Sequence, residues 1–401
     1  MLLERMENMS VKVVTVGVRG YAANYARALL EELHSGKFTY SGVIARDITK
    51  SEFCEVIQSE RIPVYKSLKD YFDDGNQADL VVISTPTHLH KEDTLLAIKH
   101  GADVLCEKPI ASLYTDAVEM MNASEKSAKF VGIGYQWSFS NANRAFKQDV
   151  MAGKLGKAIE MKTLVSWPRG WDYYDSAWKG KIKDNSGNYV LDSVVANATA
   201  HYLHNMYDVL GEQADSSDMP EVIRCELLRA NNIENFDTCF LDITTRKGTK
   251  LIFIASHAPD SDIEDGPKFV FNFEKAVVTF NMDGEANHII ATFNDGTVKD
   301  YGNPFETVHH RLWDAIDSVT TREPLVCSVK TAIAHTLTIN SLNDYGEIVD
   351  FPAELVVHDE EKQKTSVKGL YELMYQAFEK SCLLTDLGIE WSKATQYVVT
   401  E

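Results

Sequence analysis

The sequence predicts an α/β protein of two domains: an N-terminal doubly wound parallel sheet, and a C-terminal α+β domain with a large, mostly antiparallel open sheet. Its 401 residues exceed the usual size of one compact core. Up to about residue 134, short apolar runs alternate with segments of helical length, which is typical of a parallel sheet with crossover helices. Beyond that point, strand-like runs follow one another across short turns. We therefore expect domains at 1–134 and 135–401.

The N-terminal alternation begins with the β-branched run 11–16, which an Ala- and Leu-rich helical segment follows. The run that begins at Leu80 is continuously apolar, as expected for a strand buried on both faces of a parallel sheet. Further strands are expected at 40–45, 63–65, 103–106 and 130–133, and helices at 21–33, 91–100 and 114–128.

The C-terminal domain should begin with a helix at 141–152 and a strand at 159–166. Between 222 and 301, strand-like runs are separated by turn signals such as Lys247-Gly248 and Asp295-Gly296, which predicts antiparallel hairpins. Helices are expected near 201–210, 305–320 and 330–346, and the last 50 or so residues should be helical and polar. Because an open apolar sheet face is a liability in a monomer, we expect a homodimer or homotetramer built on this sheet.

Composition restricts the function classes. The formal net charge of −19 opposes binding to nucleic acid and to anionic membranes, since both need a basic surface. No apolar run approaches the roughly 20 residues that span a bilayer. The six cysteines are scattered without a C-x-x-C pair, and residues 1–8 carry acids and lack the apolar core of a secretory signal. We therefore predict a cytoplasmic protein.

A glycine-containing turn should join the first strand to the first helix. Thr15-Val16-Gly17-Val18-Arg19-Gly20 lies where dinucleotide-binding Rossmann folds carry G-x-G-x-x-G, with Thr15 in place of the first glycine. Gly17, Val18, Arg19 and Gly20 would then contact a pyrophosphate near the helix N-terminus. The alternative is an ordinary tight strand-to-helix turn.

The end of the second strand should face the adenosine ribose, where an acid binds a 2′-hydroxyl and an arginine accepts a 2′-phosphate. Arg46 comes directly after the apolar run and Asp47 follows it. The cofactor is thus predicted as NAD(P), with a slight preference for NADP. An exposed ion pair without a cofactor role is the alternative.

Two stretches resemble one oxidoreductase family. The first runs from Ser84-Thr85-Pro86 to His90 and ends after the following strand in Glu107-Lys108-Pro109; the second is Asn197-Ala198-Thr199-Ala200-His201. They resemble the Gfo/Idh/MocA family (glucose–fructose oxidoreductase and inositol dehydrogenase relatives), whose domain order covers nearly the whole chain. The resemblance implies an NAD(P)-dependent dehydrogenase or reductase that transfers hydride to or from a CH–OH carbon of a sugar, glycoside or inositol-like polyol.

The resemblance also implies residue roles. Lys108 would contact the nicotinamide ribose and the substrate, and His201 would transfer the proton. The remaining cofactor contacts implied are Ser84, Thr85, Pro86, His90, Glu107 and Gln136. Asn197 stands where most members have Asp, and Ser138 replaces a frequent Arg, so Asp192 is a possible substitute carboxylate.

Oxidising a secondary alcohol needs a base for the hydroxyl proton, and the pKa of imidazole is suited to this task. His201 has a rival in His204, one helical turn later, which we expect to be a packing residue. Although His201-x-x-His204 is a spacing seen in metal pairs, no third ligand is evident, so no metal is predicted.

An aromatic loop should contact the substrate. Three tryptophans, two tyrosines and several charges lie within residues 167–181, and such a loop can stack on a sugar ring while its charged groups bind hydroxyls. The predicted contacts are Trp167, Arg169, Tyr173, Trp178 and Lys181, together with Asp192, Asn197 and His201. A hydrophobic plug that fastens the loop to the sheet is the alternative.

Two other functions remain open. A related enzyme could oxidise its sugar transiently on a retained NAD and cleave a glycoside by elimination. A non-catalytic dinucleotide-binding regulator is the third hypothesis, although such a sensor would not need to keep Lys108 and His201 together.

Overall fold

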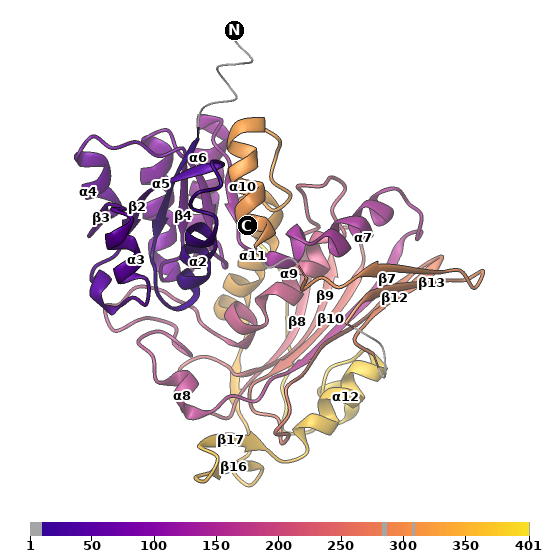
Figure 1. The fold of residues 1–401 in the computed structure, drawn as a ribbon. Helices are drawn as coiled ribbons and strands as arrows, with labels where there is room; N and C mark the ends of the chain where they lie inside the picture. Colours follow the sequence, from indigo (N-terminus) through magenta and orange to yellow (C-terminus); the bar gives the residue numbers. More distant parts are fainter. Residues whose placement is uncertain (1–9, 283–286, 307–308, 401) are drawn as a thin grey trace. The chain divides into compact units, whose positions relative to one another are not determined.

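The computed structural model describes residues 10–282, 287–306 and 309–400. Contacts within the chain group it into two units, which Figure 1 colours along the sequence. The first contains the described residues of Met1–Ala111, Thr115–Gln136 and Thr307–Lys330, and the second contains those of Ser112–Tyr114, Trp137–Glu306 and Thr331–Glu401. The chain therefore returns to the first unit after most of the second has been formed, a feature that the alternation of strands and helices does not indicate.

The first unit has a six-stranded parallel sheet in the order β3-β2-β1-β4-β5-β6, which confirms the doubly wound prediction. Its strands β4 and β5 are buried along their whole length, as the continuous apolar run indicated. The strands are β1 (Val11–Val16), β2 (Phe38–Ile44), β3 (Val64–Tyr65), β4 (Leu80–Ile83), β5 (Asp103–Cys106) and β6 (Val131–Ile133).

Helices flank this sheet. They are α2 (Ala23–Glu31), α3 (Cys54–Ser59), α4 (Leu68–Asp73), α5 (His90–Lys99), α6 (Tyr114–Ser127) and the late helix α10 (His310–Thr321). Helix α10 packs against β1, β4 and β5, and Figure 1 shows it in orange among the indigo and purple elements. Its apolar face, which includes Leu312, Ala315 and Ile316, is buried there.

The second unit has a ten-stranded, mostly antiparallel sheet, in which only the pairs β7–β10 and β8–β15 run parallel among the described strands. Side chains that alternate along a strand form its inner face: in β11 the buried residues are Pro267, Phe269, Phe271 and Phe273, each two positions after the last. The strands are β7 (Ala158–Ser166), β8 (Pro220–Arg229), β9 (Thr238–Thr245), β10 (Lys250–Ser256), β11 (Asp265–Phe273), β12 (Ala276–Phe280), β13 (Ile289–Phe293), β14 (Val298–Gly302), β15 (Ile348–Asp350) and β18 (Thr395–Val398).

Apolar cores lie on both faces of this sheet. The larger core joins the inner face to α7 (Asn141–Met151), α9 (Ala200–Asp208) and α11 (Val329–Tyr345). A second core joins the other face to α12 (Leu370–Lys380), which packs against β7 and β10. The expectation of one largely open face is therefore corrected, because α12 covers that face over part of its width. Exposed apolar residues remain on β12 and β14.

The C-terminal segment departs from the predicted helical character. Besides α12 it contains β15 and β18, which both pair with β8, and the hairpin of β16 (Val356–Asp359) and β17 (Lys364–Val367). Each of these strands has three or four residues, which is too short to give a clear period-2 pattern in the sequence.

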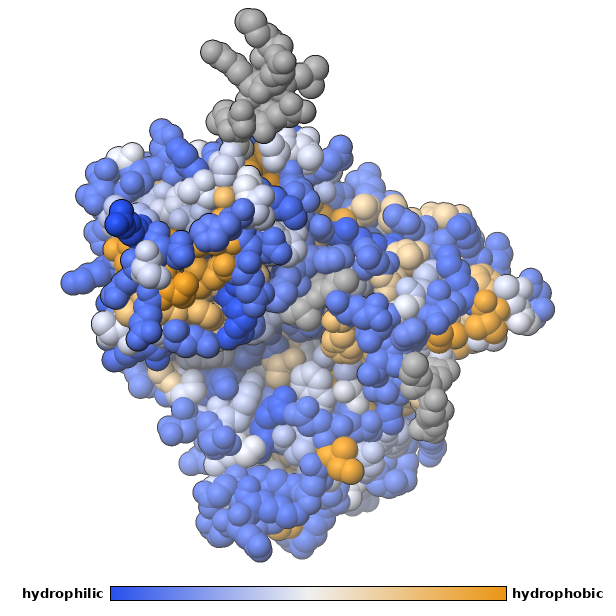
Figure 2. Space-filling view, in the orientation of Figure 1, coloured by the Kyte–Doolittle hydropathy of each residue, from blue (hydrophilic) through white to orange (hydrophobic). Residues whose placement is uncertain are grey.

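Figure 2 shows a surface that is mainly hydrophilic, with smaller apolar areas, as the charge of the chain leads one to expect. Among the described helices, none combines the length and apolar character required to cross a membrane.

Candidate functional site

The turn between β1 and α2 is built for close approach of another group. Gly17 has φ +102°, and a Cβ at this position would lie 2.8 Å from the backbone oxygen of Ser84, so only glycine fits. The turn lies where the order of the sheet reverses between β1 and β4, the place where such sheets bind dinucleotides. Val18 is buried, whereas Arg19 and Gly20 are exposed at the start of a short 3-10 turn. These residues fit the backbone cradle that a pyrophosphate requires.

At the end of β2, Arg46 and Asp47 have different environments although both are exposed. The Asp47 carboxylate accepts hydrogen bonds from the backbone N–H (3.1 Å) and the hydroxyl of Thr49, and so caps the 3-10 turn Ile48–Lys50. The Thr49 hydroxyl lowers the pKa of Asp47, with Lys50 adding to the effect. Asp47 is thus engaged in its own turn, while contact of Arg46 with a ribose or phosphate stays a prediction.

Ser84, Thr85 and Pro86 follow β4 and are followed by the short turn Thr87–Leu89. His90 is buried at the start of α5, with its Nε2 atom 2.9 Å from the Thr85 oxygen and its Nδ1 atom 3.0 Å from the Pro109 oxygen. Burial lowers the pKa of this imidazole. His90 therefore joins the segments after β4 and β5, and its direct contact with a cofactor stays a prediction.

Glu107 is a buried carboxylate at the end of β5, with 5% of its surface exposed. Tyr25 donates a hydrogen bond to its Oε1 atom, and its Oε2 atom accepts one from the backbone N–H of Lys108 at 3.1 Å. A Cβ at Gly134 would lie 2.7 Å from Oε1, so the glycine leaves room for this carboxylate. Lys108 itself is partly exposed beside it.

Arg311 in α10 is the residue of this cluster that the sequence did not reveal. It is 1% exposed, its Nε atom lies 3.4 Å from Glu107, and it donates to the hydroxyl groups of Tyr25 and Tyr21, the latter at 2.7 Å. It also reaches the side-chain oxygen of Gln136 at 3.4 Å. Burial opposes its charge, but Tyr25 and Glu107 raise the pKa of Arg311. No motif surrounds Arg311, so only the fold could bring it to Glu107.

In the second unit, Asn197 and His201 lie at a helix start, as expected. Asn197 belongs to the π-helical turn Val194–Ala198, and His201 is the second residue of α9; both are partly exposed. Asp192 is buried and its Oδ2 atom accepts a hydrogen bond from the backbone N–H of Gly180 at 2.6 Å. Asp192 thus fixes the loop before the turn, and its proposed action beside His201 stays a prediction.

His204 lies in the core, in contrast to His201. Its Nε2 atom is 3.0 Å from the hydroxyl of Ser138, which donates to Asp208 at 2.8 Å, and Lys147 donates to the same carboxylate at 2.6 Å. Burial, with the nearby charge of Lys147, lowers the pKa of His204 to about 3. Ser138 is therefore part of a buried polar network.

Part of the aromatic loop is packed around charged groups. Trp167 donates from Nε1 to the Gly266 oxygen at 3.1 Å, and the Arg169 guanidinium lies 5.4 Å from the Trp167 ring and 5.5 Å from the Tyr173 ring. Lys179 stacks on Tyr173 at 3.8 Å, and burial lowers the pKa of Lys179. These contacts agree with both interpretations of the loop, namely a hydrophobic plug and a surface that contacts the substrate.

Trp178 and Lys181 lie farther along the same loop, and both are partly exposed. The Lys181 ammonium donates to the side-chain oxygen of Asn185 at 2.8 Å, while its backbone oxygen accepts from Asp192. Lys181 is therefore held by neighbouring loop residues, and its contact with a substrate stays a prediction.

His257, at the end of β10, is a second residue that the sequence did not reveal. It is buried, its Nδ1 atom lies 3.0 Å from the Tyr174 hydroxyl, and its ring meets that of Tyr173 edge-on at 5.2 Å. Burial, with the charges of Arg169 and Lys179, lowers the pKa of His257 to about 3. Its Nε2 atom has no hydrogen-bond partner in the described part of the chain. It is a neutral polar group beside the predicted substrate loop.

Within residues 10–282, 287–306 and 309–400, no group of three or more His, Cys, Asp or Glu side chains is arranged to hold a metal ion.

Comparison with known proteins finds a family match in the N-terminal part of the chain. Residues 11–135 match the model described as an oxidoreductase family with an NAD-binding Rossmann fold, Gfo/Idh/MocA. Residues 11–135 are thus similar to the Gfo/Idh/MocA family, and the match covers less than half of the chain. The matched stretch contains the Gly17 turn, the segment after β4 and the Glu107-Lys108 pair.

Named relatives share the N-terminal part. A 1,5-anhydro-D-fructose reductase from Ensifer adhaerens is 32% identical over 30% of this chain and 35% of its own length. A 2,7-anhydro-N-acetylneuraminate hydratase from Escherichia coli is 29% identical over 35% of this chain and 36% of its own length. The chain thus spans little more than a third of the length of these two curated relatives.

The fold extends further than the sequence similarity. The WlbA dehydrogenase of Bordetella pertussis, solved with NADH and UDP-GlcNAcA, aligns with a TM-score of 0.66 and 18% identity, over 84% of this chain and 95% of that one. At this identity the likeness shows a common fold, and it includes the second unit as well as the first.

Proposed function

We propose that this protein belongs to the Gfo/Idh/MocA family and is an NAD(P)-dependent oxidoreductase that transfers hydride to or from a CH–OH carbon of a sugar, glycoside or cyclic polyol. The observation that carries the proposal is the Gly17 turn, where the clash with Ser84 excludes any side chain. This turn lies at the switch point between β1 and β4, and the next strand of the sheet, β5, is followed by Glu107-Lys108. The reductase relative and the dehydrogenase neighbour support a sugar-like substrate.

The bound dinucleotide would supply the hydride donor or acceptor. Lys108 would bind the reacting oxygen through its ammonium group, and buried Glu107 would fix the backbone from which Lys108 projects. His201, which is partly exposed at the start of α9, would accept or return the hydroxyl proton. Arg46 would favour NADP by pairing with a 2′-phosphate, since the Asp47 carboxylate is engaged in its own turn.

A second candidate is a reaction without net redox change, in which a sugar is oxidised transiently and an elimination or addition follows. It is favoured by the relative named as a hydratase of an anhydro sugar. A dinucleotide that copurifies and is not consumed would distinguish this enzyme from a dehydrogenase.

Purified protein should be analysed for bound dinucleotide by mass spectrometry and then tested against sugars and cyclitols by absorbance near 340 nm. His201→Ala should keep the dinucleotide bound but lose about 10²–10⁴-fold in turnover, because it lacks the proton acceptor. Lys108→Ala should lose at least as much. His34→Ala, at an exposed histidine, serves as the control. Turnover near that of the parent protein in His201→Ala would contradict the assignment.

A further inference from the structure

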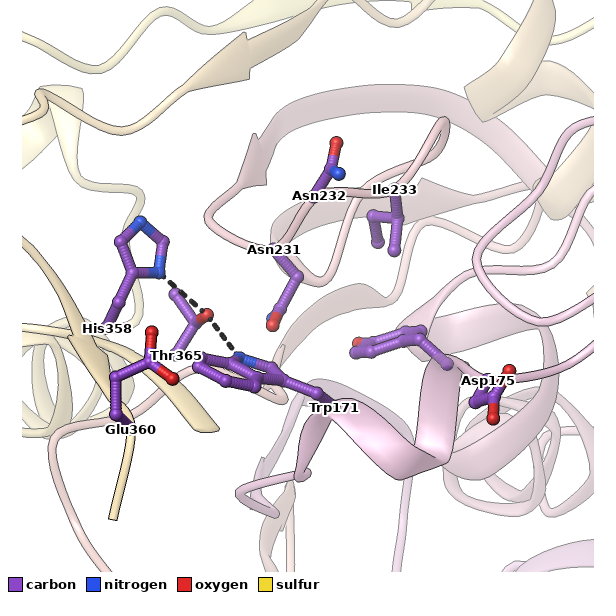
Figure 3. A pocket seen from close by; sticks show the side chains of 9 residues that line it. Trp171, Asp175, Asn231, Asn232, Ile233, His358, Glu360 and Thr365 are labelled. Atoms are coloured by element: carbon purple, nitrogen blue, oxygen red, sulfur yellow. Dashed lines mark hydrogen bonds between the residues drawn. The ribbon is translucent and has the colours of Figure 1, made fainter. Parts of the chain in front are cut away.

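A pocket of about 500 Å³ lies within the second unit and is lined in part by Tyr174, whose hydroxyl is hydrogen-bonded to His257. Three segments form it: the one-turn helix α8 (Trp171–Tyr174), the loop after β8, and the β16–β17 hairpin (Figure 3). Its lining includes Trp171, Tyr174, Asp175, Asn231, Glu360 and Thr365.

Asn231 presents an unsatisfied acceptor to the pocket. Its side chain is 5% exposed and donates from Nδ2 to Asp237 at 2.8 Å. Because a carboxylate only accepts hydrogen bonds, this contact fixes the amide orientation and turns Oδ1 away from Asp237. Oδ1 is buried and has no partner among the described residues. Figure 3 shows this oxygen pointing into the space beside Trp171. A buried acceptor of this kind calls for a ligand donor or a water molecule.

Trp171 forms a fixed aromatic wall. Its Nε1 atom donates to the Thr365 hydroxyl at 2.9 Å, and its backbone N–H donates to the Gln363 oxygen at 2.7 Å. The indole is only partly exposed, and its hydrogen-bonding atom is already used, so the ring offers a flat apolar surface. Tyr174 likewise uses its hydroxyl on His257 and contributes its ring. Two pre-positioned rings beside one acceptor suit a ligand with an apolar face and hydroxyl groups.

The charges of the pocket disfavour acidic sugars. Asp175 and Glu360 are exposed carboxylates among the lining residues, and no described lining residue is a lysine or arginine. A carboxylate or phosphate on the ligand would therefore meet like charges, and His358 is the one lining residue among those described that can carry a positive charge. A neutral saccharide carries no charge that Asp175 and Glu360 would repel.

We propose that this pocket binds a neutral glycosyl ring, stacked on Trp171 with one hydroxyl donating to Oδ1 of Asn231, and that it holds the non-reacting ring of a glycoside substrate. The second part rests on the proposed function, because it assumes that Tyr173, next to Tyr174 on α8, contacts the reacting ring. The first part is independent of any reaction.

Isothermal titration of the full chain with maltose, cellobiose, lactose and glucuronic acid tests the binding. At least one neutral disaccharide should bind more tightly than glucuronic acid. Trp171→Ala and Asn231→Leu should each weaken that disaccharide about tenfold or more, since one removes the stacking surface and the other the acceptor. Tyr189→Ala, at an exposed aromatic residue outside the pocket, should bind like the parent protein.

Glu360→Lys tests the charge preference of the pocket at an exposed position outside the apolar cores. It should shift preference toward glucuronic acid, because it replaces a repelling charge with an attracting one. The proposal is overturned if no neutral disaccharide binds, if glucuronic acid binds best to the parent protein, or if the Trp171 and Asn231 variants bind unchanged. Disaccharide binding that depends on Trp171, without any dinucleotide-linked reaction, would support the pocket and count against the proposed function alone.

Discussion

Single atoms decide the geometry around Glu107. At Gly134 a Cβ would lie 2.7 Å from the Glu107 carboxylate, closer than real Cβ contacts allow, and that carboxylate is held by Tyr25 and Arg311. The glycine is therefore required by its neighbour rather than by backbone conformation, since Gly134 does not have a positive φ.

We expect Gly134→Ala to lower the free energy of unfolding by about 1–3 kcal/mol, the usual cost of an overpacked core. The penalty should shrink when Glu107 is also replaced by Ala, because the clashing carboxylate is then gone. Urea denaturation of the two single variants and the double variant measures this coupling. If the losses in unfolding free energy of the two single variants simply add in the double variant, the added methyl group does not clash with Glu107.

Buried histidines should make the protein acid-sensitive. The pKa of His204 is about 3 in the fold, against roughly 6.5 for an unfolded histidine. The folded state therefore binds fewer protons than the unfolded state between these values, so this contribution to stability is complete above pH 6.5 and is lost as the pH falls toward 3. The lowered pKa of His257 likewise gives a contribution to stability that is lost as the pH falls.

His204→Gln should reduce the slope of unfolding free energy against pH by up to about 1.4 kcal/mol per pH unit between pH 6.5 and 5. Urea denaturation at several pH values in this window gives the slope. His34→Gln, at an exposed imidazole, controls for the loss of one histidine. An unchanged slope in the His204 variant would mean that His204 gains no proton on unfolding.

At the scale of elements, α10 supplies a cation to a carboxylate that the N-terminal segments bury. Replacing Arg311 by Met would leave Glu107 charged and buried without its cation, which should cost about 3–5 kcal/mol. Arg27→Met is the matched control in the same unit, because its pair with Glu52 is solvent-exposed and should contribute at most about 1 kcal/mol. Thermal and urea unfolding of both variants should separate them clearly; equal losses would contradict the buried ion pair.

The elements that the sequence predicted best are those with strong local signals. The continuous apolar run gave β4, and the glycine turn placed the start of α2, whereas α10 was expected as a helix without any indication that it joins the first unit. Arg311 and His257 could not be predicted from the sequence, because neither lies in a motif and each meets its partners only in the folded structure. Local sequence patterns indicate helices, strands and turns, whereas the contacts between distant residues depend on the tertiary structure.

At the scale of the whole molecule, the outer face of the second sheet carries exposed apolar residues. Register places Val277 of β12 beside Thr292 of β13, which is beside Val298 of β14, and these valines are 36% and 61% exposed. The α12 core covers β7 and β10 on this face, so the apolar row lies beyond it. We therefore propose a homodimer or homotetramer that buries this row.

Val277→Glu should shift the protein toward the monomer, because burying a carboxylate in the contact would be costly. Multi-angle light scattering at micromolar concentration gives the mass against the 45.0 kDa chain. Val56→Glu, at a similarly exposed valine in the first unit, should not change it. A parent protein of monomer mass would remove the proposal.

The late position of α10 also sets an order of events during synthesis. The six strands of the parallel sheet leave the ribosome long before residues 310–321, since residues 137–306 of the second unit are made in between. A domain normally folds as its chain emerges, N-terminal part first. Until residues 310–321 are made, the nascent sheet lacks the contacts of α10 with β1, β4 and β5, and Glu107 lacks its arginine. Translation of residues 137–306 therefore precedes completion of the first unit, and a ribosome that stalls within them would release a sheet that lacks one of its covering helices.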